Sequence, residues 1–319
     1  MSYLCQIALG PVQGFIASAR RTRDMWFGSY VLSEISRATA LSLVGDETQA
    51  ELIFPSVPPN LKDAEGEPVS LKSGHFLVVN ILLAKLPCCT RDEALATIAR
   101  ARLAAETRWG EACADAKSQI NNVHTIPHRR RDAADTTEFL RNNVWTAQLS
   151  DVIEFYAAAV QIADDGNDYS SALGALKRGL AARKASRVFR PLVESTQLFS
   201  LPKSSLDGAQ STVVQEADDS TLRKRIERTR RRLGIEPAEQ LDTAGMVKRV
   251  VGRARSFVPV ARIAVQPWLE TLSPTQLKQL QAAYNACCAY ELDAQLGSKI
   301  GDVASELFPW VADFAFDAQ

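Results

Sequence analysis

The sequence predicts an α+β fold, because short apolar strand-like segments alternate with long amphipathic helices in its first half, while its second half is mainly helical. The predicted order over 1–165 is strand, helix, strand, strand, helix, strand. This is the split βαβ order of ferredoxin-like domains, which have an antiparallel sheet with two helices on one face. We therefore expect a ferredoxin-like βαββαβ domain over 1–165 and a mainly helical domain over 166–319.

The first strand is predicted at Tyr3–Leu9 and ends at the turn Gly10-Pro11. Proline suits the first position of a helix, where its missing N–H is not needed. Apolar residues then recur at helical spacing as far as Leu41, which predicts one continuous helix. The other elements expected in this domain are strands at 50–56, 74–84 and 151–163 and a helix at 91–120, although the alanines of 151–163 leave a helix open there.

The second half begins with a helix from Tyr169 that carries basic residues along one side. A Ser-, Pro- and Gly-containing break at 201–214 reads as a loop or hairpin. A strongly basic helix follows at 220–234, with Ser220 as candidate N-cap. The remaining segments predict a helix at 239–252, a connector at 259–269 and a long helix at 273–297.

Composition indicates a cytoplasmic protein with no membrane role. Lys plus Arg and Asp plus Glu are 37 each in 319 residues, so any basic site is a local patch. No apolar run approaches the ~20 residues of a membrane span, and the start lacks the features of a signal peptide. The six cysteines form no C-x-x-C pattern, which favours reduced, structural thiols.

The turn Gly10-Pro11-Val12-Gln13 is the first candidate site. It connects a strand to a helix, where backbone N–H groups and the helix dipole favour an anion such as phosphate. A tight turn without a ligand is the alternative.

Two basic clusters are the next candidates. The first is Arg20, Arg21, Arg23 and Asp24, in which Arg20 and Asp24 are spaced as a helical ion pair. It is either a solvated face or a contact for a partner, a nucleic-acid phosphate or a nucleotide. The second cluster is either a solvated helix or a nucleic-acid contact to phosphates, and its members are Arg223, Lys224, Arg228 and Arg231.

No complete catalytic or metal-binding set is visible. The pair His124 and His128 lacks accompanying carboxylates, and the sequence has no Gly-Gly-Asp-Asp turn, Walker loop or nucleophile elbow. We therefore assign no catalytic residues and no metal ligands.

Several stretches resemble one family in order along the chain. "GPVQGFIASARRTRDMWFGSYVLSEISRA" resembles the opening motif of the first palm domain in the large (Cmr-two/Cas-ten) subunit of type III-B, Cmr-type, CRISPR effector complexes. "LPKSSLDGAQSTVV" is similar to that family's zinc-loop segment, "LGIEPAEQLDTAGMVKRVVG" to the helical domain after it, and "FPWVADFAFDAQ" to the connector leading onward.

The resemblance implies a crRNA-guided antiviral effector in which ATP binds between two palms and is converted to cyclic oligoadenylate. Gly10, Pro11, Val12 and Gln13 would then face the nucleotide, as half of the ATP site. Mg²⁺ or Mn²⁺ would be held mainly by a second palm. By this resemblance the chain lacks both that second palm and the HD nuclease. The implied partners are the second palm, other effector subunits, crRNA and target RNA. Because this chain lacks the metal-binding palm, we expect it to be inactive alone. Zinc is not expected, because Ser204 and Asp207 replace cysteines. Alternatives are a non-catalytic scaffold subunit and a free-standing nucleotide-binding regulator.

Overall fold

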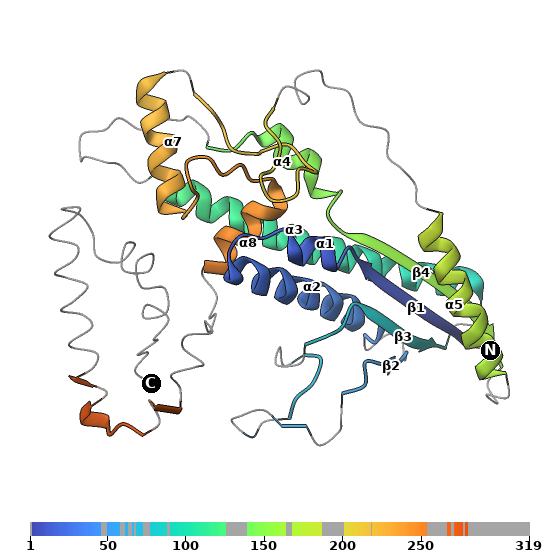
Figure 1. Cartoon of the computed structure of the whole chain (residues 1–319). Helices are drawn as coiled ribbons and strands as arrows, with labels where there is room; N and C mark the ends of the chain where they lie inside the picture. The colour runs from blue at the N-terminus through green and yellow to red at the C-terminus, as the bar shows by residue number, and fades with distance from the viewer. Residues whose placement is uncertain are drawn as a thin grey trace.

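The computed structural model in Figure 1 shows an elongated α+β core with further helices packed at one end. The residues that the structure describes are 2–45, 50–57, 61–62, 66, 68–72, 77–87, 90–125, 139–163, 168–186, 201–217, 219–253 and a few positions between 267 and 279.

The four strands that the structure describes form one antiparallel sheet in the order β2-β3-β1-β4. Their bounds are β1 Ser2–Gly10, β2 Glu51–Phe54, β3 Ile81–Leu86 and β4 Glu154–Ile162. The central strand β1 pairs along nearly its whole length with both β3 and β4. The predicted α+β class is confirmed, and the strands follow the split βαβ order.

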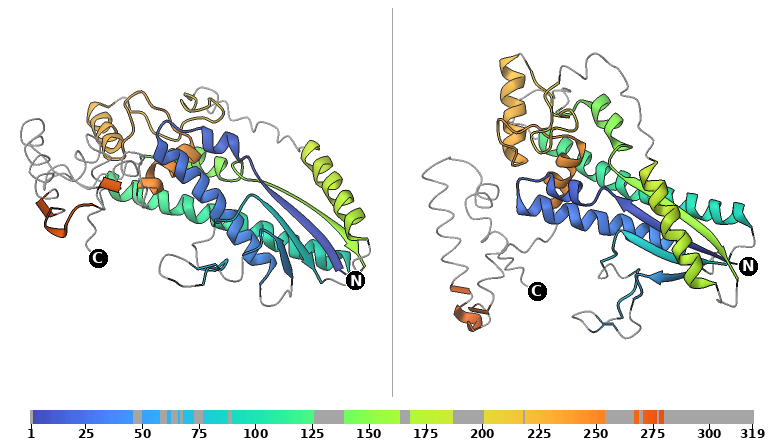
Figure 2. Two further views of the ribbon diagram at one scale, coloured as in Figure 1. Left: turned by 60° about the horizontal axis from the view of Figure 1, so that its bottom comes forward. Right: turned by 45° about the vertical axis from the view of Figure 1, so that its right-hand side comes forward.

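Both faces of the sheet are covered by helices (Figure 2). Alternate residues of a strand point to opposite faces. Cys5, Ile7 and Leu9 belong to the larger core cluster, which is built with α2 (Thr22–Leu43) and α3 (Arg91–Thr125). Leu4 belongs to a second cluster with α5 (Tyr169–Ala185) on the other face.

Two expectations from the sequence are wrong in this core. The helix predicted to run continuously from Pro11 is two helices, α1 (Gln13–Ala17) and α2, separated by a break at 18–21. The third strand begins at Ile81 rather than residue 74. Just before β3, two hydrogen bonds join Asn80 to Leu9 of β1. The Asn80 side-chain amide donates to the Leu9 carbonyl, and the Leu9 N–H donates to the backbone carbonyl of Asn80.

The remaining helices lie at the end of the sheet near the β1–α1 connection. They are α4 (Asn142–Leu149), α7 (Ser220–Arg232) and α8 (Thr243–Arg253), and α8 packs against α2 and α3. The N-cap of α7 is Asp219 rather than Ser220: its carboxylate accepts from the N–H groups of Thr221 and Leu222, both at 2.8 Å.

Segment 201–214 is a hairpin-like loop closed by a bridge between Lys203 and Ser211. A hairpin is one of the two forms, loop or hairpin, that the sequence predicts for this segment. Most of the predicted helix at 273–297 and the whole of "FPWVADFAFDAQ" lie outside the described residues. Among the helices that the structure describes, none is both long and apolar enough to cross a membrane.

Candidate functional site

A buried ionic cluster connects α8 to the start of α2. The Arg249 guanidinium donates through Nε to Asp24 Oδ2 and through Nη1 and Nη2 to both carboxylate oxygens of Glu239, each at 2.8 Å. Its Nη1 also donates to the Gly234 carbonyl at 2.6 Å. All three charged side chains are at most 4% exposed, so none of them can exchange its partner for water without local opening.

The electrostatics of this cluster shift the pKa values of the two carboxylate partners of Arg249 in opposite directions. Burial raises the pKa of Glu239, but the hydrogen bonds and charge of Arg249 outweigh it, and the net shift is downward. Burial raises the pKa of Asp24 more than Arg249 lowers it. Burial lowers the pKa of Arg249, whereas its two carboxylate partners raise it, with a net upward shift. The charged forms of Arg249 and Glu239 are therefore stabilised by each other.

The neighbouring residue Lys248 fixes the break between α1 and α2. Its fully buried ammonium donates to the Phe15 carbonyl at 2.7 Å, to the Ser18 carbonyl and to Ser18 Oγ at 3.0 Å, and lies 4.8 Å from the centre of the Phe15 ring. Gly28 leaves the space for it, since a Cβ at residue 28 would lie 3.2 Å from Lys248 Cδ. The α1–α2 break is thus a docking point for α8.

The predicted nucleotide turn is accessible but rests on a short helix. Gly10 ends β1 opposite Glu154, Pro11 and Gln13 are exposed, and Val12 is half-buried. Because α1 has only five residues, few peptide dipoles are aligned behind the turn. The dipole argument for phosphate at this turn is correspondingly weak.

The first basic cluster is divided by the structure. Arg20 is exposed in the break, and Arg21 lies 3.7 Å from the Glu236 carboxylate. Arg23 is half-buried in the first turn of α2. Asp24 bonds to Arg249 and not to Arg20, so the spacing-based pairing is wrong, because residues 18–21 are not helical.

A pocket of about 580 Å³, here called the turn pocket, opens beside the predicted nucleotide turn. Trp26 and Tyr30 line it as a stacked pair, with ring centres 5.5 Å apart and planes at 15°. Its other lining residues are Val12, Ile16, Ser29, Leu32, Ser33, Ser36, Leu77, Val78, Val79 and Asn80. Leu77 and Val79 are strongly exposed, which gives the pocket an apolar rim of the kind found at interfaces.

The second basic cluster is also divided by its contacts. Arg225 and Arg232 donate to the carbonyls of His124 and Val123, each at 3.3 Å, and so cap the C-terminal end of α3. Arg230 is buried against the loop that follows α7. Three further basic residues share one outward stripe of α7 at positions i, i+4 and i+7, here called the α7 stripe: Lys224, Arg228 and Arg231. Arg223 lies on a different side and donates to the Ala217 carbonyl.

The loop that resembles a zinc loop is held by hydrogen bonds of its own. The buried Ser204 donates its N–H to the Gln210 carbonyl, and Asp207 Oδ1 accepts from the Ala209 N–H at 2.9 Å. Among the residues that the structure describes, no group of three or more His, Cys, Asp or Glu side chains could hold a metal ion. Cys5 and Cys113 are buried and are not joined in a disulfide, and burial raises the pKa of Cys113 to about 12.

Sequence reasoning missed the buried cations of α8. The signal was present in "AGMVKRVVG", where Lys248 and Arg249 interrupt an apolar run. Two adjacent cations inside a buried helix require partners, but nothing in the sequence indicates that some of those partners, Phe15, Ser18 and Asp24, lie more than two hundred residues earlier.

One family model matches part of this chain. Residues 4–117 match the family model described as CRISPR-associated protein Cmr2, N-terminal. Comparison with curated proteins finds no match. A solved structure described as the cryo-EM structure of the type III-B Cmr-beta bound to cognate target RNA matches with a TM-score of 0.48 and 15% identity. That match covers 79% of this chain and 32% of the other, so the chain spans about a third of its length. The opening motif lies within the family match, and the predicted resemblance to the large Cmr-type subunit is therefore confirmed over residues 4–117.

Proposed function

We propose that this chain is the palm-containing part of the large subunit of a crRNA-guided type III CRISPR effector complex, and that it contributes half of the ATP site used for cyclic oligoadenylate synthesis. The family match over residues 4–117 and the split βαβ order support the assignment. The main observation in support of the proposed ATP site is the turn pocket, which is lined by Val12 of the predicted nucleotide turn.

The turn pocket suits the base of a nucleotide better than its phosphates. Its walls are mainly apolar and aromatic, and none of the lining residues that the structure describes is basic. Stacking on an aromatic ring stabilises a bound base by about 1–3 kcal/mol, and Tyr30 and Trp26 offer such rings. Serine hydroxyls and the Asn80 amide supply hydrogen-bonding groups around it. In this proposal the chain orients adenosine, and a second palm holds the metals and the reacting phosphates.

A second contact follows from the α7 stripe. Lys224, Arg228 and Arg231 project along one line of the helix, whereas Arg225, Arg230 and Arg232 bind backbone carbonyls. We assign RNA phosphates to this stripe, because side chains that cap other elements are not available for a ligand. Arg223, the fourth residue predicted for nucleic acid, is excluded from this assignment by its place on another side of the helix.

The test of the ATP site is Trp26→Ala. Losing one stacking wall should raise the Kd for ATP about 5- to 150-fold, which corresponds to ~1–3 kcal/mol. Binding is measured by calorimetry in the complex assembled with the second palm, together with cyclic oligoadenylate yield. Leu103→Ala, an exposed apolar position on α3, is the control. Normal ATP binding in Trp26→Ala would contradict the site, and an assembled complex that binds no ATP would favour the scaffold alternative.

A further inference from the structure

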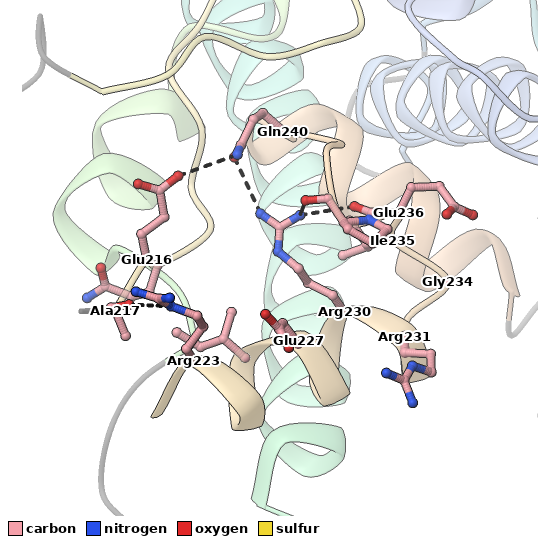
Figure 3. Close-up of a pocket in the computed structure, with 13 residues that line it drawn as sticks. Glu216, Ala217, Arg223, Glu227, Arg230, Arg231, Gly234, Ile235, Glu236 and Gln240 are labelled. Atoms are coloured by element: carbon pink, nitrogen blue, oxygen red, sulfur yellow. Dashed lines mark hydrogen bonds between the residues drawn. The ribbon is translucent and has the colours of Figure 1, made fainter. Parts of the chain in front are cut away.

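A second pocket, here called the α7 pocket, lies between α7, residues 215–217 and the loop 234–240 (Figure 3). Its volume is about 760 Å³. Among the residues that the structure describes, the charged lining is balanced, with three arginines and three glutamates: Arg223, Arg230, Arg231, Glu216, Glu227 and Glu236. Ala217, Ile226, Ile235 and Pro237 add apolar surface.

Arg230 is the deepest charged group of the α7 pocket and is incompletely bound. It is 6% exposed, and its Nη1 donates to the Glu239 carbonyl at 2.7 Å and, at 3.2 and 3.4 Å, to the carbonyls of Glu236 and Pro237. On the other edge, Nη2 reaches Gln240 Oε1 only at 3.5 Å, and the same amide reaches Glu216 Oε1 only at 3.5 Å (Figure 3). Such contacts lie beyond the usual 2.7–3.2 Å of N–H···O bonds. A carboxylate from a ligand would bind this edge more tightly, because charge-assisted bonds are shorter and stronger.

The glutamates decide what kind of ligand brings that carboxylate. Glu216 and Glu236 are 57% and 68% exposed, and Glu227 is exposed on α7. A nucleic-acid strand carries a phosphate at every nucleotide, so it would be repelled by three carboxylates around one pocket. Glu216 and Glu236 already lie 3.9 and 3.7 Å from Arg141 and Arg21. A polypeptide carries both signs of charge, and a basic side chain of it would pair with Glu227.

We infer that the α7 pocket is a docking site for a segment of a partner protein, with an acidic side chain on Arg230 and a basic side chain against Glu227. The inference rests on the proposed function for the identity of the partner, another protein subunit of the same effector complex. The α7 stripe and the α7 pocket then bring the two partners to adjoining surfaces of one helix, since Lys224 and Arg228 lie outside the pocket lining and Arg231 lies where the two surfaces meet.

The experiment places a photo-cross-linking benzoylphenylalanine at Ala217 of the full chain, in a complex reconstituted from purified subunits with guide and target RNA. We expect a cross-link to a polypeptide, which peptide mass spectrometry places within a few residues of an acidic side chain. The same group at Leu103, on the exposed face of α3, is the control and should not label that segment. A cross-link to RNA, or none to protein in an assembled complex, overturns the inference.

A charge reversal supplies a second measurement. Glu227→Lys should weaken association with the partner subunit at least tenfold in the absence of RNA, whereas Glu106→Lys, at an exposed glutamate of α3, should not. Equal affinities for the two variants overturn the inference while leaving the proposed function intact. A chain that joins no effector complex at all overturns both.

Discussion

Arg249 and Arg230 approach the same residue, Glu239, from two sides and are bound to very different extents. Arg249 holds the Glu239 carboxylate, Asp24 and a carbonyl at 2.6–2.8 Å in a closed interior. Arg230 holds the Glu239 carbonyl with one edge and leaves the other edge at 3.5 Å from Gln240, facing a pocket. A fully bonded guanidinium fixes the fold, whereas one with a loosely held edge retains binding capacity. The following predictions test that division.

The largest expected effect is on stability, in Arg249→Met. Removing the guanidinium leaves Asp24 and Glu239 buried without their cation, and breaking a buried pair in this way costs about 3–5 kcal/mol of the free energy of unfolding. Urea denaturation followed by circular dichroism measures it. Arg231→Met, on the exposed α7 stripe, is the control and should change stability by no more than ~0.5 kcal/mol. A loss below ~1 kcal/mol in Arg249→Met would show that the buried cluster is not a structural tie.

A smaller loss is expected where α1, α2 and α8 meet. Gly28→Ala puts a Cβ 3.2 Å from Lys248 Cδ, so the Lys248 side chain must give by a few tenths of an ångström in a site where its ammonium is held by Phe15 and Ser18. Overpacking of this kind costs about 1–3 kcal/mol. Gly14→Ala is the matched control, because a Cβ there meets nothing within 4 Å. Equal free energies of unfolding for the two variants would contradict the account of Gly28.

Sequence reasoning recovered the elements whose periodicity is local. β1, β2, β4 and the helices α3, α5, α7 and α8 lie where their patterns predicted them, because strand alternation and helical spacing are properties of short segments. The α1–α2 break was not recovered. The apolar spacing continues through residues 18–21, and the group that stabilises the break, Lys248, lies on another element.

The candidate site was recovered only in part. The predicted turn does adjoin a pocket, but the pocket is completed by residues 77–80, which the sequence assigned to a strand. Asp24 was grouped with its neighbouring arginines, although its partner is Arg249. Sequence spacing identifies which charged residues are close along the chain, and only the tertiary structure identifies which of them are bound to other groups within the folded chain.

A further prediction concerns acid. Burial raises the pKa of Glu34, but hydrogen bonds and charge from Arg37 and Arg108 outweigh it, so the net shift is downward, as for Glu239. A carboxyl whose folded pKa lies below its unfolded value of about 4.3 stabilises the fold above that pH, and this stability is lost as pH falls through the folded pKa. Glu34→Gln should therefore flatten the fall of Tm on acidification below about pH 5. Glu111→Gln, an exposed neighbour of Arg108, should retain the wild-type slope, and identical slopes in all three proteins would contradict the assignment.

The smallest effect on stability, and the sharpest on binding, is expected from the α7 stripe. The triple variant Lys224→Gln, Arg228→Gln, Arg231→Gln removes charges that hold no other element in place, so its free energy of unfolding should change little. If these side chains bind RNA phosphates, affinity for single-stranded RNA should fall, and the slope of log K against log salt should become shallower by about 2, at ~0.7 per phosphate contact. Fluorescence anisotropy with an RNA oligonucleotide between low and moderate salt measures both quantities in the assembled complex. The control removes three basic residues elsewhere, Lys117→Gln, Lys177→Gln and Arg178→Gln, on α3 and α5. An equal change of slope in the two triple variants would mean that the α7 stripe acts only as general surface charge. It would contradict the division of the α7 cations into those bound by the fold and those available to bind RNA.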